Sequence, residues 1–416
     1  ARARDGVTAA RSHRLTNGLT LAVEPMDGVE TLAVGLYADV GSRNEPDGLG
    51  GLAHMVEHMV FKGAGNRDAR GIAEAIEDRG GTLNAWTARD HTVFHARLLA
   101  GDLGLGLDII ADLIRSPHFA PDELERERQV VLAELGEARD TPDDIIFDHL
   151  SAVAYDGQPL GRPVLGNEAS IAAIDVAALK GWLRDQYQPQ RLVIAAAGKV
   201  DEDELLKLVE GRFGDLVAAS APPSVPASFT VGRHHDKRRF DQLHLAFAHP
   251  APAYRDADIH AMAAFAQVAG GGMSSRLFQE LREARGLAYS IYAWAQPYAD
   301  TGMFGVYCAA QRNEAGRALE LAGEVLARTA ETLDEAELAR AKAQAKAGLL
   351  MGLEAVATRC DHLARQLQVH GRIVPATESV EQIDAVTVAA ARAAGQAALS
   401  RPRALATVGG TLARAA

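Results

Sequence analysis

Cysteine, long apolar runs and positive charge are all scarce in this sequence, and each shortage excludes a class of protein. The 416 residues include two cysteines, Cys308 and Cys360. A disulfide framework is therefore excluded, and the pair has no metal-binding spacing. We expect two reduced thiols in the core, with a single disulfide bond as the alternative. No run approaches the ~18 apolar residues of a membrane-spanning helix. Lys and Arg total 43 against 55 Asp and Glu, a net charge of −12. This charge argues against nucleic acid or an anionic membrane as the main partner.

The rest of the composition is that of an ordinary globular protein, with 48% apolar and 24% charged residues. A chain of this length can form two or more domains with large cores. The sequence begins at Ala1 without methionine. A removed signal peptide explains this start, and so does a sequence trimmed at its beginning. The first explanation favours a periplasmic location, and a cytoplasmic location is the alternative.

A short stretch at 50–61 carries the strongest chemical signal. It places His54, Glu57 and His58 among almost exclusively apolar residues. On a helix, Glu57 lies roughly 60° to one side of His54 and His58 roughly 40° to the other, so the three share one narrow polar arc. Burying three ionisable side chains is costly, and a divalent metal bound by both imidazoles compensates that cost. The order His-x-x-Glu-His inverts the commoner zinc motif and predicts the same chemistry, with the glutamate as general base.

A catalytic zinc usually takes a third protein ligand, and Glu134 is the best candidate. It lies within 130–135, the least charged part of a predicted helix that begins near Pro121. Glu127 lies seven residues earlier, two turns along the same face, where it can hydrogen-bond a ligand histidine. The alternative for both glutamates is a solvated charged helix face.

The sequence repeats itself at nearly one offset. The segment 242–248 resembles 31–36, and 403–409 resembles 191–196, with almost the same separation in both cases. Two matches at nearly one offset indicate an internal duplication. We therefore predict an α+β fold of two homologous α/β-sandwich domains, each a mostly antiparallel sheet with helices packed on it.

The domain limits follow from one change in composition. The Pro-rich segment 221–226 is typical of a linker. We predict a zinc-binding catalytic domain at 1–218, a linker at 219–232 and a homologous domain without zinc at 233–416. The second half has no His-x-x-Glu-His at the corresponding place, so one chemical site is expected in the chain.

With these residues in place, the sequence resembles the pitrilysin, insulysin and mitochondrial processing peptidase family of zinc metallopeptidases. The family has a glutamate ligand well downstream of the second histidine, at the separation that Glu134 has from His58 here. It also has a glutamate seven residues before that ligand, where Glu127 stands. The resemblance implies one zinc ion per chain held by His54, His58 and Glu134. It also implies that Glu127 supports catalysis.

The resemblance extends to two further segments. Asn84 and Ala85 match the family's substrate-binding edge strand, where an extended peptide adds as a strand through backbone hydrogen bonds. Arg282 and Tyr289 match an Arg/Tyr pair in the half without zinc, and the expected roles are to hold a substrate carbonyl and to stabilise the oxyanion. From the residues alone, a surface salt bridge and a core tyrosine are equally good interpretations. The resemblance also implies that the pair acting at one zinc comes from a second subunit, because a single chain of this length supplies only half of the family's closed shell. A homodimer, or a heterodimer with a homologous chain lacking zinc, is therefore expected.

These observations together predict a zinc-dependent endopeptidase that hydrolyses short or unfolded peptides in a closed chamber, with Glu57 as general base. A non-catalytic scaffold or partner subunit of a peptidase-like complex is the alternative from a different class. A processing protease that removes targeting segments is the alternative among enzymes. The complete set of His54, Glu57, His58 and Glu134 favours an enzyme.

Overall fold

Two sheets, whose strand orders are equivalent over five strands, organise the part of the chain that the computed structural model describes, residues 10–410 and 412. The first sheet has the order β1-β2-β8-β3-β7-β6, and only its β2–β8 pair is parallel. Its strands are β1 Arg11–Arg14, β2 Thr20–Pro25, β3 Thr31–Ala38, β6 Thr82–Thr87, β7 Thr92–Leu99 and β8 Leu192–Gly198.

The second sheet repeats this arrangement in the later half of the sequence, without a counterpart of β1. Read from its other edge, its order is β9-β13-β10-β12-β11, and only the β13–β9 pair is parallel. Its strands are β9 Gly232–Asp236, β10 Leu243–Pro250, β11 Ala288–Pro297, β12 Gly302–Ala310 and β13 Ala404–Val408. Strands β3 and β8 therefore correspond to β10 and β13, the two pairs whose sequences match at nearly one offset. The predicted α+β fold with an internal duplication is confirmed.

The described residues form two units, each built around one sheet. Unit 1 comprises Ala1–Glu134, Pro163–Val225 and Leu350–Val374, and unit 2 comprises Leu135–Arg162, Pro226–Leu349 and Pro375–Ala416, within the described ranges. Residues 1–4, where the expectation of a removed signal peptide originates, lie outside those ranges.

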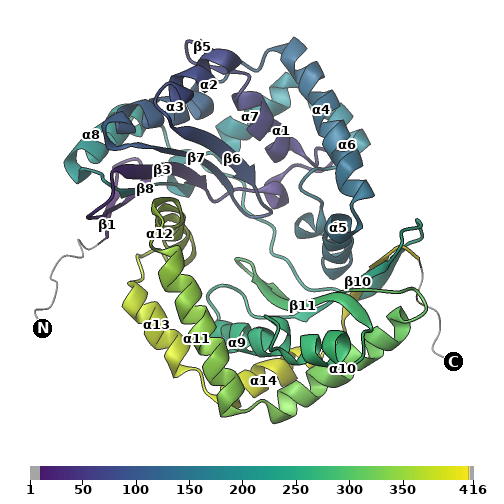
Figure 1. Ribbon diagram of the computed structural model, residues 1–416. Coiled ribbons are helices and arrows are strands. Elements are labelled where there is room, and N and C mark those ends of the chain that lie inside the picture. The colour runs from purple at the N-terminus through teal and green to yellow at the C-terminus, as the bar shows by residue number, and fades with distance from the viewer. Residues whose placement is uncertain (1–9, 411, 413–416) are drawn as a thin grey trace, which may run out of the picture. The chain divides into compact units, whose positions relative to one another are not determined.

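Helices pack around each of the two sheets (Figure 1). Those of unit 1 are α1 Leu52–Val60, α2 Ala69–Glu77, α3 Leu103–Arg115, α6 Glu168–Ala173, α7 Val176–Gln186, α8 Glu202–Phe213 and α12 Val356–His370. Those of unit 2 are α5 Pro142–Ala154, α9 Ile259–Gly270, α10 Ala315–Thr332, α13 Ala376–Ala385 and α14 Val388–Leu399. Helices α4 Pro121–Asp140 and α11 Glu335–Gly352 cross from one unit to the other along the chain. No helix among the described residues is long and apolar enough to cross a membrane.

Each unit takes one helix from the opposite half of the sequence. Helix α12 packs on β8 and β3 of the first sheet, and α5 packs on β13 and β10 of the second. Under α12, Cys360, Leu363 and Leu367 join a buried cluster with Tyr37 and Val193 of the sheet. Sequence order and packing therefore differ. All strands of the first sheet precede residue 219 and those of the second begin at Gly232, whereas α5 and α12 are exchanged. The predicted limits, 1–218, 219–232 and 233–416, divide the chain into consecutive domains, and they stay a prediction.

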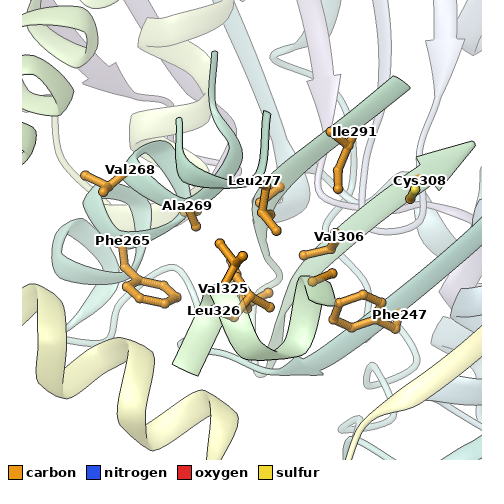
Figure 2. Packing of buried hydrophobic residues seen from close by; sticks show 14 of the residues in the cluster. Phe247, Phe265, Val268, Ala269, Leu277, Ile291, Val306, Cys308, Val325 and Leu326 are labelled. Carbon is orange, nitrogen blue, oxygen red and sulfur yellow. The ribbon is translucent and has the colours of Figure 1, made fainter. Parts of the chain in front are cut away.

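A dense apolar core packs on the second sheet, on the face opposite to α5. Phe247, Phe265 and Leu326 lie within it, with less than 2% of their surfaces exposed (Figure 2). Cys308 also belongs to this core and Cys360 lies in unit 1, and both are free, buried thiols. Burial raises the pKa of each thiol to about 12.

Candidate metal centre

Helix α1 presents the polar triplet and is otherwise buried. Its apolar side chains are fully covered; they are Leu52, Ala53, Met55, Val56, Met59 and Val60. Gly51 begins the helix with a left-handed φ of 90°. A Cβ there would lie 2.7 Å from the Leu165 carbonyl oxygen, so only glycine fits this position.

A carboxylate from a residue outside the helix caps it, because Gly51 has no side chain to do so. Glu45 is 4% exposed. Its Oε2 accepts a hydrogen bond from Gly51 N at 3.0 Å, and its Oε1 accepts one from Ala53 N at 2.8 Å. These bonds satisfy backbone donors at the positive end of the helix, which stabilises the turn that immediately precedes His54.

The structure brings His54, His58 and Glu134 together. Glu134 Oε2 lies 3.8 Å from His54 Nε2 and 3.5 Å from His58 Nε2. One ligand atom from each of the three side chains lies within 4.8 Å of the others. Within the described ranges, no other set of three His, Cys, Asp or Glu side chains meets this criterion.

This donor set fits zinc. Tetrahedral zinc with bonds of about 2.1 Å has ligand atoms about 3.4 Å apart, close to the two distances from Glu134 Oε2. Two imidazoles and one carboxylate are also ligands that zinc takes in catalytic sites, with the fourth position left open. The geometry therefore accommodates a single zinc ion between the two turns of α1 and the second half of α4.

Glu127 fixes which nitrogen of His58 faces the cluster. Its Oε2 accepts a hydrogen bond from His58 Nδ1 at 3.0 Å. A carboxylate only accepts, so Nδ1 carries the hydrogen and the lone pair of Nε2 faces Glu134. The other oxygen of Glu127, Oε1, lies 2.8 Å from Lys62 Nζ. The Glu127 residue is 5% exposed.

Burial shapes the protonation of the triplet. It lowers the pKa of His54 to about 4, with a smaller contribution from His58. A neutral imidazole, the form that binds metal, is therefore favoured at neutral pH. Burial also raises the pKa of Glu57 above its ordinary value, and a hydrogen bond from Thr87 opposes this shift. Thr87 Oγ1 donates to Glu57 Oε2 at 2.6 Å.

Strand β6, which carries Thr87, ends its sheet, so the backbone of its outer edge faces away from β7. Asn84 and Ala85 lie in this strand. Asn84 is exposed and its Oδ1 accepts a hydrogen bond from the backbone N of Ala85, whereas the Ala85 side chain is buried. An edge strand beside the metal helix provides the place that strand addition by a peptide requires.

Arg282 and Tyr289 lie near each other in unit 2. Arg282 lies near the end of a short π-helical turn, Phe278–Glu283, and Tyr289 is near the start of β11. The guanidinium carbon lies 4.8 Å from the ring centroid of Phe278 and 5.9 Å from that of Tyr289. Both residues are exposed, and Arg282 forms no ion pair within the described residues. The predicted salt-bridge alternative therefore does not apply to Arg282, and the core alternative does not apply to Tyr289.

Sequence reasoning missed three residues that hold the centre: Glu45, Lys62 and Thr87. Lys62 stands four residues after His58, a helical spacing that places the two side chains on the same face and could have indicated a shared partner. The contacts of Glu45 and Thr87 depend on tertiary structure. His91 is mostly buried with its ring 4.6 Å from that of Trp86, and neither it nor His95 belongs to the metal cluster.

Comparison with known proteins agrees with the zinc site that the geometry indicates. Residues 21–168 match the sequence profile of insulinase (peptidase family M16), and residues 173–345 match that of the peptidase M16 inactive domain. An uncharacterized zinc protease of Mycobacterium bovis is 36% identical over 96% of this chain and 93% of its own length. The uncharacterized zinc protease YmxG of Bacillus subtilis is 32% identical over 89% of this chain and 91% of its own.

Solved structures share the fold. A protease from Helicobacter pylori superposes with a TM-score of 0.89 at 23% identity, covering 96% of this chain and 99% of that one. A peptidase M16 inactive domain protein from Pseudomonas fluorescens also gives 0.89, at 22% identity, covering 98% and 99%.

Proposed function

Because the chain belongs to the insulinase family of zinc proteases, peptidase family M16, we propose that it is a zinc-dependent endopeptidase acting on short or unfolded peptides. The observation that carries this proposal is the convergence of His54 Nε2, His58 Nε2 and Glu134 Oε2 beside the carboxylate of Glu57. His54, His58 and Glu134 would hold the ion. When bound, zinc would polarise the scissile carbonyl and make water more acidic.

Glu57 is the residue placed to move protons. Its Oε2 is held by Thr87, and its Oε1 has no hydrogen bond within the described residues. The free oxygen would take a proton from the attacking water and pass it to the nitrogen of the leaving amine. Burial, which raises the pKa of this carboxyl, makes it a stronger base than an exposed glutamate.

The substrate would bind as an additional strand on β6. Backbone hydrogen bonds along Asn84 and Ala85 would hold a peptide independently of its sequence, which suits short or unfolded chains. Arg282, stacked on aromatic rings and without an anionic partner, would bind a substrate carbonyl, and the exposed Tyr289 would donate to the developing oxyanion.

We propose that the pair acting at one zinc comes from a second subunit, which closes a peptide chamber in a homodimer or in a heterodimer with a zinc-less homologue. Both Arg282 and the zinc-binding residues are present in this chain, so a homodimer suffices. Analytical ultracentrifugation combined with activity measurement tests this, and full activity of a monomer would contradict it. The periplasmic location stays a prediction.

The deciding experiment is cleavage of a quenched fluorescent peptide library by the purified protein. Cleavage should be lost with a chelator, return on adding zinc and be abolished in Glu57→Gln, whereas metal analysis should still find one zinc in that variant. Glu74→Gln, an exposed glutamate that pairs with Arg70 on α2, is the matched control and should cleave normally. Tight zinc binding without any cleavage would favour the non-catalytic partner subunit.

A further inference from the structure

We propose that Lys62 is a positioning residue for the metal centre, acting on His58 through Glu127. This inference rests on the proposed zinc site. The three side chains form one chain of contacts: Lys62 Nζ lies 2.8 Å from Glu127 Oε1, and His58 Nδ1 donates to Glu127 Oε2 at 3.0 Å. Each oxygen of the carboxylate thus has its own donor, which fixes the plane of the carboxylate.

The buried position of Glu127 makes a cationic partner necessary. Its side chain is 6% exposed, and the only basic side chain other than His58 paired with it among the described residues is Lys62. A buried carboxylate that loses its ion partner is strongly destabilised, so it turns toward water. A displaced Glu127 would no longer accept a well-aligned hydrogen bond from His58 Nδ1.

The local backbone holds Lys62 at this position. Its amide donates to the Met59 carbonyl at 3.2 Å, one turn back, at the end of α1. The next residue, Gly63, has a φ of 147°, and a Cβ there would lie 2.4 Å from His118 Nδ1. These contacts constrain the backbone at the end of α1, and from this backbone the Lys62 side chain reaches the same glutamate as His58.

The consequence concerns the histidine tautomer. When Glu127 accepts from Nδ1, the lone pair of His58 is on Nε2, the atom 3.5 Å from Glu134 Oε2. Lys62 keeps Glu127 oriented for this task. It has no ion pair with Glu134 among the described residues, so its effect passes through Glu127.

The test is the zinc affinity of the full-length protein, measured on the metal-free form by competition with a chelator of known affinity. Lys62→Met is expected to bind zinc about 10-fold more weakly, the lower end of the range for residues that support a ligand histidine. Lys62→Arg keeps the charge and should recover most of the affinity. Lys199→Met is the matched control, because Lys199 forms an exposed ion pair with Glu30 in the same unit, and its affinity should equal that of the wild type.

A double-mutant cycle separates positioning from general structural damage. If Lys62 acts through Glu127, then Lys62→Met should add no more than about a 2-fold loss in the Glu127→Gln background. Lys62→Gln replaces Lys62→Met throughout if the latter does not fold. Two results would overturn the proposal. One is wild-type zinc affinity in Lys62→Met, and the other is a double mutant in which the affinity losses of Lys62→Met and Glu127→Gln multiply. Zinc binding by the wild type that does not require His54 would overturn both this inference and the proposed function. Binding without peptidase activity would count against the function alone.

Discussion

Truncation of one leucine in α12 should destabilise a sheet whose strands all come from the other half of the sequence. Leu363 is 1% exposed and packs against the face of the first sheet formed by β3 and β8. Leu363→Ala removes three carbon groups, about 2.4 kcal/mol at ~0.8 kcal/mol each. The cavity left behind raises the expected cost to about 3–4 kcal/mol.

Urea unfolding followed by circular dichroism measures this cost. Leu350→Ala is the matched control, because this leucine is 49% exposed, is also in the segment Leu350–Val374 of unit 1 and should lose no more than about 0.5 kcal/mol. Hydrogen exchange read by mass spectrometry then locates the damage. Protection should fall first in β3 and β8, from the N-terminal half.

Two results would contradict this reasoning. Loss of protection confined to β10–β13, with β3 and β8 unchanged, would mean that α12 supports the sheet of its own half. A cost below about 1 kcal/mol would mean that the helix does not complete the core of unit 1. Either outcome would remove the physical basis for the exchanged helices.

Three further predictions concern residues around the centre. Glu45→Ala leaves two backbone donors of α1 without acceptors, so it should lower the stability of the protein by about 1–3 kcal/mol and weaken zinc binding. The control is Asp68→Ala, which removes the cap of α2. It should cost about 1 kcal/mol of stability and leave zinc affinity unchanged in the same thermal and chelator assays. Thr87→Val removes the hydrogen bond to Glu57 and should lower kcat about 10-fold or more with unchanged zinc content, since bonds to charged groups contribute about 1.5–3 kcal/mol; an unchanged kcat would show that this bond does not matter. Burial lowers the pKa of His91 to about 3, against about 6.5 when unfolded, so the unfolded state binds the proton first and stability is complete above pH ~6.5 and falls toward pH ~3. Between pH 7 and pH 5, His91→Phe should therefore lose about 2 kcal/mol less than the wild type in urea unfolding, and equal losses would contradict the reasoning.

Local and periodic features of the fold could be predicted from the sequence. The Asn17–Gly18 pair predicts the hairpin between β1 and β2, and Gly18 indeed has a left-handed φ of 96°. The two pairs of matching segments, which share nearly one offset, predict two equivalent sheets. These features depend on neighbouring residues or on similarity within the chain, and both are visible without a structure.

The exchange of α5 and α12 could not be predicted in this way. Leu363 and Leu367 form an ordinary apolar helix face. Such a face predicts that the helix will be buried on that side, but it does not predict which sheet will cover it. The Pro-rich segment near 221–226 favours a division of the chain into consecutive domains. Only the packing reveals that each sheet is covered by a helix from the other half.

The metal centre shows the same division between local and tertiary information. The spacing of His54 and His58 places two ligands on one helical face, and this can be read from a single short stretch. Helix α1, with nine residues, is too short to form in isolation, so its geometry must come from elsewhere in the fold. Glu45 fixes its first turn, while Glu127 and Lys62 hold its end. The motif therefore specifies which chemistry is possible, and residues outside it determine whether the side chains are held in the arrangement that the chemistry needs.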